Sequence, residues 1–427
     1  MSTICVHGLG YIGLPTAAMF ANYGYEVVGY DVSEELVSRL NQGDVHIEEP
    51  GLRAFVTQAL ESGKLRIESE IVPSKYHLIC VPTPFDTESQ RADLSYVEAA
   101  ASATTPHLRT GDTVILESTV PPGTTVGTVQ PILEESGFEA GKDVALVHCP
   151  ETVLTGDMIT ELKQNDRVIG GVNGVSTEAA VRLYETFLEG EIRTAANATT
   201  AEFVKLLQNT YRDTNIALAN EVAKLARDYR IDSRAAIELA NSHPRVDLHQ
   251  PGPGVGGHCL PIDPWFLGQE SDELDLVARA RQINDEMPAY VVNLVDDHFE
   301  SLAGRKIAIL GIAYKGNVGD TRMSPGLQVA AQLRAIELTD EDSDGPAEPP
   351  RISLNDPHVT DQTRDLEDLE TAIDGADAVV ITCDHDEYAA IDPETLASRM
   401  RGSVVVDTKA IVDEDAYRES ALTVVRL

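Results

Sequence analysis

The chain has 427 residues, which is too long for one hydrophobic core and predicts two or three domains. Hydrophobic residues make up 42% and charged residues 24%, so a largely disordered protein is excluded. The 70 Asp and Glu against 33 Lys and Arg give a net charge of -37, which would repel nucleic acid. These acids are spread along the chain, as in proteins of halophilic archaea, and indicate a solvated acidic surface.

The first residues show no signal-peptide pattern. Ser2 to His7 run directly into a glycine-rich turn, without a basic region or a long apolar stretch. No segment approaches the length of a membrane span, so we expect a cytoplasmic protein that does not contact a membrane. Five cysteines without Cys-x-x-Cys spacing argue against a disulfide framework and a structural zinc site, and we expect no metal.

Short β-branched runs alternate with helical periods in the first part of the chain, which predicts an α/β domain with a parallel sheet. The expected strands are Thr3 to Val6, Val27 to Tyr30, Leu78 to Val81, Val114 to Glu117 and Ala145 to His148. The alternation returns near the C-terminus, at Lys306 to Leu310, Ile352 to Leu354, Ala378 to Thr382 and Val404 to Val406. The sequence therefore predicts two Rossmann-type α/β domains.

The middle of the chain has helical periodicity and few strand candidates, and Thr200 to Tyr229 contains neither Pro nor Gly. We therefore expect an N-terminal domain over 1–197, a central helical domain over 198–302 and a C-terminal domain over 303–427. Glu337 to Pro350 is rich in Asp, Glu, Pro and Gly and predicts a solvated loop.

The segment Gly8-Leu9-Gly10-Tyr11-Ile12-Gly13 follows an apolar strand and opens a helical stretch, the context of a dinucleotide site. Its glycines allow a pyrophosphate to approach the backbone at a helix N-terminus, where N–H groups and the helix dipole favour an anion. Asp31 ends the next expected strand, where a carboxylate accepts hydrogen bonds from ribose hydroxyls and repels a 2′-phosphate. NAD is the expected cofactor.

Cys259 differs from the other four cysteines. Cys5, Cys80, Cys149 and Cys383 lie in or beside apolar strand runs, where cysteine usually acts as a small buried hydrophobe. Cys259 follows a loop with four glycines, from Gly252 to His258, which permits close approach of the backbone to a ligand. A thiol in that position is a candidate nucleophile, although a structural turn explains the pattern equally well.

Three polar residues in the central segment share one helical face. Lys205, Asn209 and Arg212 are spaced by four and then three residues. By itself this spacing favours an ordinary solvated face.

Taken in order, several motifs resemble those of the UDP-glucose/UDP-N-acetylmannosamine dehydrogenase family. They are the Gly8–Gly13 turn, Cys80-Val81-Pro82-Thr83-Pro84, Glu117-Ser118-Thr119-Val120-Pro121-Pro122-Gly123-Thr124 and the Cys259 loop. The resemblance covers almost the whole chain. Within the family, Asn209 to Asp213, His243 to Val246 and Cys259 to Trp265 are similar to the branch that oxidises UDP-N-acetyl-D-mannosamine.

The resemblance implies an NAD domain, a helical centre that mediates dimerisation, and a UDP-binding domain, in a homodimer or higher homo-oligomer of polysaccharide biosynthesis. It implies NAD contacts by Gly8, Gly10, Tyr11, Ile12, Gly13, Asp31, Thr83, Thr119 and Arg322. It assigns the UDP-sugar to Val153, Lys205, Asn209, Arg212, His243, Arg245, Gly256, Tyr314, Lys315 and Lys409. Basic side chains suit a diphosphate.

One position departs from this branch. Thr152 stands in Cys149-Pro150-Glu151-Thr152-Val153-Leu154 where the branch usually has arginine. Glu151 and Asp263 match acidic positions that the wider family uses for water activation and proton transfer.

The implied reaction converts the C6 alcohol to an acid by two hydride transfers, with Cys259 forming a thiohemiacetal and then a thioester. Lys205 and Asn209 would stabilise the oxyanion. The first proton is removed either by Lys205 or by a water held by Thr119 and Asp263, and the sequence does not decide between them. The alternatives are a UDP-glucose or UDP-N-acetylglucosamine 6-dehydrogenase and a catalytically silent NAD-binding sensor.

Overall fold

A computed structural model describes residues 3–153, 156–336, 348–361 and 363–427. The chain divides into two compact units: residues 1–208 with 265–272, and residues 209–264 with 273–427. Most of the loop expected over Glu337 to Pro350 lies outside the described residues. Among the residues described, no helix has both the length and the apolar character needed to cross a membrane.

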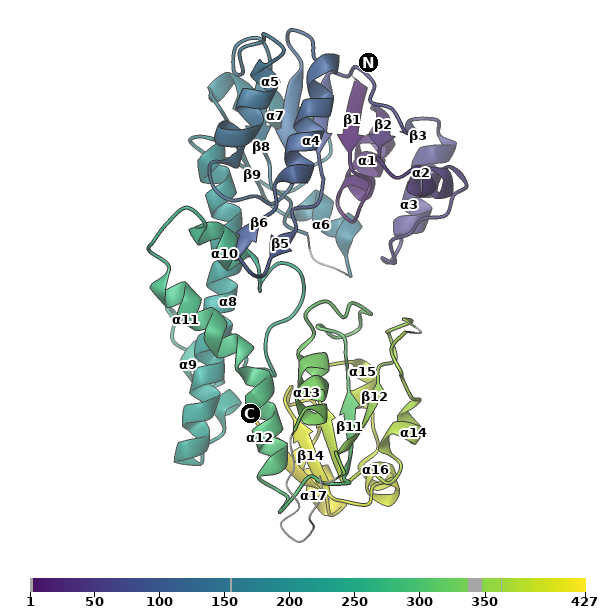
Figure 1. Cartoon of the computed structure of the whole chain (residues 1–427), viewed down its shortest axis with the longest axis vertical. Coiled ribbons are helices and arrows are strands. Elements are labelled where there is room, and N and C mark those ends of the chain that lie inside the picture. Colours follow the sequence, from purple (N-terminus) through teal and green to yellow (C-terminus); the bar gives the residue numbers. More distant parts are fainter. Residues whose placement is uncertain (1–2, 154–155, 337–347, 362) are drawn as a thin grey trace. The chain divides into compact units, whose positions relative to one another are not determined.

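The first unit contains an eight-stranded sheet in the order β10-β9-β8-β7-β4-β1-β2-β3 (Figure 1). Its strands are β1 Thr3–His7, β2 Glu26–Tyr30, β3 Leu65–Glu68, β4 Tyr76–Ile79, β7 Thr113–Leu116, β8 Ala145–His148, β9 Arg167–Gly171 and β10 Ile192–Thr194. All five strands expected here are present. Neighbouring strands pair in parallel except β8 and β9, which are antiparallel. A short hairpin, β5 Phe85–Asp86 and β6 Arg91–Ala92, forms a separate ribbon.

Helices cover both faces of this sheet. The helical elements are α1 Gly13–Asn22, α2 Glu34–Asn41, α3 Leu52–Glu61, α4 Ser95–Thr104, η1 Thr105–His107, η2 Thr125–Val129, α5 Gln130–Glu134, α6 Met158–Gln164 and α7 Gly174–Tyr184. Ile4 and Val6 of β1 join the core under α1, whereas Ile79 and Leu116 join the core under α4 and α5. The alternation of side chains along each strand thus builds two apolar layers.

The second unit contains a five-stranded parallel sheet in the order β12-β11-β13-β14-β15. The strands are β11 Lys306–Leu310, β12 Arg351–Asn355, β13 Ala378–Ile381, β14 Val404–Asp407 and β15 Thr423–Arg426. The helices are α9 Ser233–Asn241, α11 Asp275–Asp285, α12 Met287–Asp296, α13 Pro325–Arg334, α14 Leu369–Ile373, α15 Asp386–Ala389, α16 Pro393–Arg399 and α17 Glu414–Glu419. Both α/β regions predicted from the sequence are therefore present.

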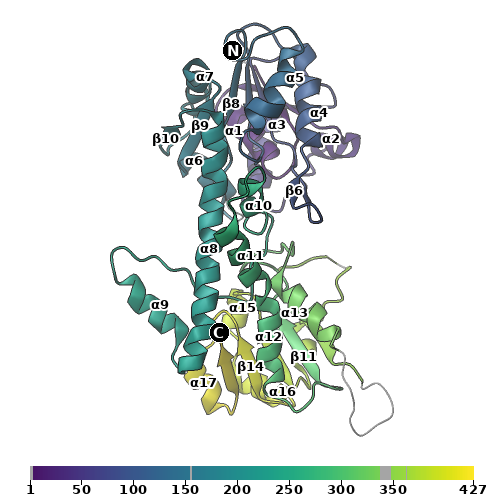
Figure 2. The same cartoon turned by 60° about the vertical axis from the view of Figure 1, so that its left-hand side comes forward.

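Two helices belong partly to each unit: α8 Ala198–Tyr229 and α10 Asp263–Gly268. Helix α8 is a single uninterrupted helix of 32 residues (Figure 2). It has no internal Pro or Gly, so nothing in its sequence breaks the backbone hydrogen-bond ladder. This confirms the long helix expected from Thr200 to Tyr229.

Candidate active site

The glycine-rich turn connects β1 to α1 in the first unit. Gly8 has a φ of 87°, and a Cβ there would lie 2.7 Å from the carbonyl oxygen of Cys80. A Cβ on Gly13 would clash with the carbonyl oxygen of Gly8, whereas one on Gly10 would meet no atom within 4 Å. Two of the three glycines are thus required by the fold itself, and Gly10 leaves the space open.

Asp31 follows β2 and is tied to the same turn. Its Oδ2 accepts a hydrogen bond from the backbone N of Leu9 at 2.8 Å, and its Oδ1 accepts one from the backbone N of Ser33 at 2.9 Å. These bonds hold the carboxylate beside the glycine-rich turn, the position that reads a ribose in dinucleotide folds.

The other cofactor residues predicted in this unit follow neighbouring parallel strands. Thr83 comes after β4 and Thr119 after β7, and the Thr83 hydroxyl donates to the carbonyl oxygen of Thr119 at 2.8 Å. Tyr11 donates a short hydrogen bond from its hydroxyl to Glu49. Because β1, β2, β4 and β7 run in parallel, these residues gather at the carboxyl edge of one sheet, the usual ligand edge of such a fold.

Glu151 is held by three donors at the end of β8. Its Oε1 accepts from the backbone N of Thr152 at 2.6 Å and of Val153 at 2.9 Å. Its Oε2 accepts from the guanidinium of Arg167, a buried residue of β9, at 2.9 Å. Nothing in the sequence pattern had singled out Arg167.

A second buried acid, Glu117, also lies near this guanidinium. Glu117 Oε1 lies 3.9 Å from Arg167, and Glu117 also accepts hydrogen bonds from Cys80 and Tyr184. Burial raises the pKa of Glu117 above its usual value, although Arg167 opposes that shift. One cation therefore serves two buried carboxyl groups.

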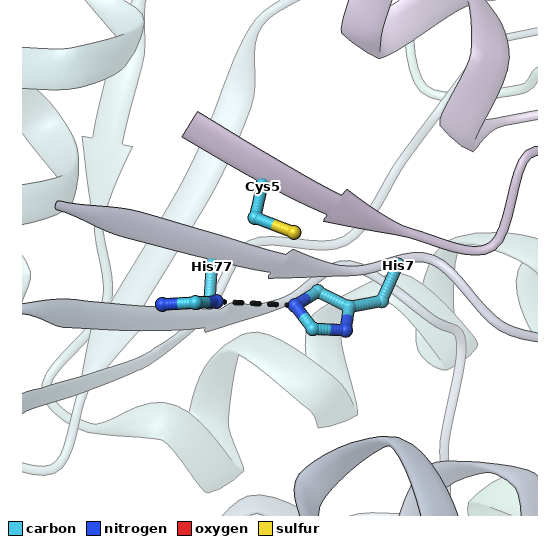
Figure 3. A group of neighbouring side chains, drawn as sticks. All are labelled: Cys5, His7 and His77. Carbon is cyan, nitrogen blue, oxygen red and sulfur yellow. Dashed lines mark hydrogen bonds between the residues drawn. The ribbon is translucent and has the colours of Figure 1, made fainter. Parts of the chain in front are cut away.

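A separate group of side chains, Cys5, His7 and His77, lies inside the first unit on β1 and β4 (Figure 3). The ring nitrogens His7 Nε2 and His77 Nδ1 are 3.1 Å apart, and His77 Nε2 accepts from the backbone N of Ser74 at 3.3 Å. That acceptor role puts the proton of a neutral His77 on Nδ1, where it donates to His7. The tautomer suits an internal hydrogen bond better than a metal ligand.

Cys259, in the second unit, is exposed, whereas Cys5, Cys80, Cys149 and Cys383 are buried as expected. Burial raises the pKa of Cys5 to about 11 and that of Cys149 to about 12, which suppresses thiolate formation there. The carbonyl oxygen of Cys259 accepts from the backbone N of Ile262 at 3.0 Å and of Asp263 at 2.8 Å. This turn leads directly into α10.

Two predicted catalytic residues, 54 positions apart, meet beside this turn. The amide of Asn209 on α8 donates to Asp263 Oδ2 at 2.6 Å, and both side chains are buried. Lys205 and Arg212, on the same helix, are half-buried.

Two glycines before Cys259 are packed against a second loop. A Cβ on Gly256 would lie 2.7 Å from Tyr314 Cβ. The backbone N of Gly257 donates to the carbonyl oxygen of Arg322 at 2.8 Å. The structure thus brings predicted residues of different roles, Gly256, Tyr314 and Arg322, to the Cys259 loop.

The remaining basic residues predicted to bind substrate occupy separate segments. Lys409 Nζ lies 3.2 Å from Asp384, and Lys315 is exposed. His243 and Arg245 are exposed on the loop after α9, where the backbone N of Arg245 donates to His243 Nδ1 at 3.3 Å.

Comparisons with known proteins cover nearly the whole chain. In the UDP-glucose/GDP-mannose dehydrogenase family, the NAD binding domain matches residues 2–188, the central domain 199–286 and the UDP binding domain 308–414. The chain belongs to this family. The family resemblance seen in the motifs is therefore confirmed, and the cofactor is NAD.

Individual proteins also match this chain over nearly its whole length. A UDP-N-acetyl-D-mannosamine dehydrogenase of Methanococcus maripaludis is 42% identical, over 99% of this chain and 96% of the relative. The solved structure of UDP-D-ManNAc dehydrogenase from Pyrococcus horikoshii has a TM-score of 0.90 and 40% identity, over 99% of this chain and 98% of that one. An NDP-N-acetyl-D-galactosaminuronic acid dehydrogenase of Ralstonia nicotianae is 39% identical, over 96% of each chain.

Proposed function

We propose that this dehydrogenase oxidises the C6 hydroxymethyl group of UDP-N-acetyl-D-mannosamine to a carboxylate, giving UDP-N-acetyl-D-mannosaminuronate. The single observation that carries the chemistry is the exposed Cys259, which follows directly after a glycine loop and comes shortly before Asp263, the buried partner of Asn209. Full-length relatives with this activity support the choice of substrate.

We propose that Cys259 holds the intermediate between two oxidations. When bound, NAD would supply the hydride acceptor for each oxidation. The Cys259 thiolate attacks the aldehyde carbon to give a thiohemiacetal, which the second oxidation converts to a thioester. Water then attacks the thioester carbon, its proton passes to a base, and the C–S bond breaks to release the acid and the thiolate.

The proposed partners of Cys259 are Lys205 and Asn209 for oxyanion stabilisation, and Glu151 and Asp263 for water activation and proton transfer. Asp263 supports the amide of Asn209 through their 2.6 Å hydrogen bond, which orients that donor. The identity of the base that removes the first proton stays open: it is either Lys205 or a water held by Thr119 and Asp263. NAD would be bound by the turn from Gly8 to Gly13, Asp31, Thr83, Thr119 and Arg322; UDP-sugar contacts would come from Val153, Lys205, Asn209, Arg212, His243, Arg245, Gly256, Tyr314, Lys315 and Lys409.

Substrate choice is tested by side-by-side kinetics. We expect UDP-N-acetyl-D-mannosamine to have a higher kcat/KM than UDP-glucose, UDP-N-acetylglucosamine and UDP-N-acetylgalactosamine, with about two NADH formed per sugar. Equal or better turnover of UDP-glucose would overturn the substrate, and one NADH with free aldehyde would overturn the four-electron reaction. NAD binding without turnover of any of these sugars would favour a silent sensor.

We propose three domains, with boundaries at 1–197, 198–302 and 303–427, and a homodimer formed through α8. Exposed apolar residues recur along that helix at intervals of seven, seven and four: Tyr211, Leu218, Leu225 and Tyr229. A stripe with this spacing suits helix packing between two copies. Light scattering of the protein and of Leu218→Glu/Leu225→Glu tests this, and an unchanged dimer in the variant would exclude the stripe as the interface.

The proposed setting is the cytoplasm of a halophilic archaeon, in polysaccharide biosynthesis. A net charge of -37 supports adaptation to salt, because screening relieves repulsion among surface carboxylates. The melting temperature should rise with KCl into the molar range. A melting temperature independent of KCl would count against this adaptation.

A further inference from the structure

A chain of buried side chains connects α11 and α8 to the start of the Cys259 loop, all within the second unit. The guanidinium of Arg281 donates to Asp213 in a short ion pair. Asn284 Nδ2 donates to Asp213 Oδ1 at 2.9 Å and to its carbonyl oxygen at 3.0 Å. Asn220 Nδ2 donates to Asn284 Oδ1 at 2.9 Å, and Asn220 Oδ1 accepts from the backbone N of Gly252 at 2.9 Å.

Because these groups are buried, each donor must keep its acceptor, and this fixes the direction of every hydrogen bond in the chain. Asp213, Asn220, Arg281 and Asn284 are each no more than 1% exposed, so water cannot replace a lost partner. The charged pair at one end fixes which atom of Asn284 is the donor. That choice fixes the orientation of Asn220, whose oxygen is then the atom that faces the Gly252 N–H.

Two later residues of the loop that begins at Gly252 also contact neighbouring segments. Gly254 has a φ of 132°, and a Cβ there would lie 3.3 Å from the carbonyl oxygen of Asn284. The backbone N–H of Gly257 donates to the carbonyl oxygen of Arg322, as described above. Cys259 follows Gly257 by two residues, so the position of its thiol depends on where this loop is held.

We infer that Asn220 is a positioning residue for the Cys259 nucleophile: it holds the Gly252 N–H at the start of the loop, and the buried Asp213–Arg281–Asn284 group sets its orientation. The side-chain hydrogen bonds of Asn220 described above go to Asn284 and to the backbone of Gly252. This inference rests on the proposed role of Cys259.

The matched test is Asn220→Asp, which exchanges one amide NH2 for an oxygen at almost constant size. The new carboxylate would face the acceptor Asn284 Oδ1, so the hydrogen-bond chain is interrupted at one point. Asn22→Asp is the control, because Asn22 likewise donates its amide to a carbonyl, that of Phe55 at 3.0 Å, but in the first unit. Asn220→Ser is the milder second variant, for the case in which the aspartate prevents folding.

Two readouts separate positioning from general stability. We expect kcat of the Asn220 variants to fall about ten- to a hundredfold, as a displaced reacting group requires, with NAD affinity within about twofold of the parent. Alkylation of Cys259 by iodoacetamide, measured against a Cys259→Ala blank, should change by about threefold or more, because the surroundings of the thiol change when the loop that precedes it moves. Asn22→Asp should leave both the alkylation rate and kcat near the parent values.

Alkylation requires no sugar nucleotide, so its outcome is independent of the proposed reaction. A folded Asn220 variant with parental alkylation rate and kcat would overturn the positioning role. Normal acid formation by Cys259→Ala would instead overturn the proposed function, whatever the alkylation rates.

Discussion

The two glycine-rich loops of this protein are anchored in similar ways, but their anchors come from different parts of the sequence. In the Gly8–Gly13 turn, the N–H of Leu9 is held by Asp31, which follows the next strand of the sheet. In the Cys259 loop, the N–H of Gly252 is held by Asn220, on a long helix that precedes the loop. Each loop thus has one backbone donor held by one distant side-chain oxygen, at 2.8 and 2.9 Å.

The difference lies in what else each anchor does. Asp31 is also a proposed ribose ligand, so removing it changes the loop and the cofactor contact together. Asn220 has no such second role, and its oxygen is oriented by a buried network. In the first loop one residue, Asp31, both anchors the loop and is proposed to bind the cofactor. In the second loop Asn220 only anchors the loop, and other residues are proposed to bind ligands.

The largest effect should come from the second loop. Cys259→Ala should lower acid formation by at least about a thousandfold, because no other described thiol is exposed to form the covalent intermediate. NAD affinity should stay near that of the parent. Cys5→Ala is the matched control, since Cys5 is buried in the first unit, and it should keep its activity. A Cys259→Ala enzyme that still forms carboxylate would exclude the covalent role.

In the first loop, two glycines should respond differently to alanine. Gly13→Ala places a methyl group against the Gly8 carbonyl and should lower the free energy of unfolding by about 1–3 kcal/mol. Gly10→Ala meets no atom within 4 Å, so its stability should be unchanged. Its NAD affinity should nevertheless fall at least about tenfold, or about 1.4 kcal/mol, since the methyl group occupies the space expected for the pyrophosphate.

Denaturant unfolding and NAD titration of both variants measure these effects. If Gly10→Ala bound NAD as tightly as the parent, the pyrophosphate would not lie over this residue.

The anchor of the first loop can be tested through cofactor choice. Asp31→Ala combined with Val32→Arg removes the carboxylate and adds a cation at a neighbouring side chain that is 82% exposed. The ratio of kcat/KM for NADP to that for NAD should rise about tenfold or more, as a charge-assisted contact of about 1.5–3 kcal/mol predicts. Val32→Arg alone should keep the preference for NAD, because Asp31 still repels the 2′-phosphate. An unchanged ratio in the double variant would place ribose recognition elsewhere.

An effect of pH on stability should distinguish the unit that contains the first loop. Burial lowers the pKa of His7 to about 3, of His77 to about 4 and of His148 to about 3, all in that unit. The unfolded chain, with histidine pKa near 6.5, binds more protons than the folded one below that value. The free energy of unfolding should therefore fall as pH drops from about 6.5 towards 4, by up to about 1.4 kcal/mol per pH unit for each histidine.

His148→Leu removes one of these titratable groups and places an apolar side chain of similar size in the buried position. Unfolding at pH 7.5 and 5.5, at constant high salt, should show a smaller difference between the two pH values in this variant than in the parent. An equal difference would mean that His148 does not titrate on unfolding in this range.

Much of the first site was predictable because its determinants are local. The Gly8–Gly13 spacing, the flanking strand and Asp31 lie within one β-α-β stretch, so sequence order and strand direction place them together. The same reasoning identified nearly all strands of the second sheet. It missed β3, β9 and β10 of the first sheet and β15 of the second, and with β9 it missed the antiparallel pairing to β8, because short strands give a weak periodic signal.

Most of the second site depends on contacts that no spacing encodes. The sequence placed Lys205, Asn209 and Arg212 on one helix, and the structure adds the hydrogen bond of Asn209 to Asp263. Asn220 could have been noticed as an amide among the buried alanines 217, 219 and 223 of α8. Its hydrogen-bond partners, Asn284 and the backbone N of Gly252, could not have been predicted from the sequence.

The sequence by itself determined the fold class, the cofactor and the chemical types available for catalysis, because backbone periodicity, glycine sterics and side-chain chemistry are local properties. Only the tertiary structure decided that Arg167 contacts Glu151 and that Asn220 holds Gly252. Hydrogen bonds between distant segments depend on how helices and strands pack and on which buried donor faces which acceptor, and neither is set by the residues on one segment alone.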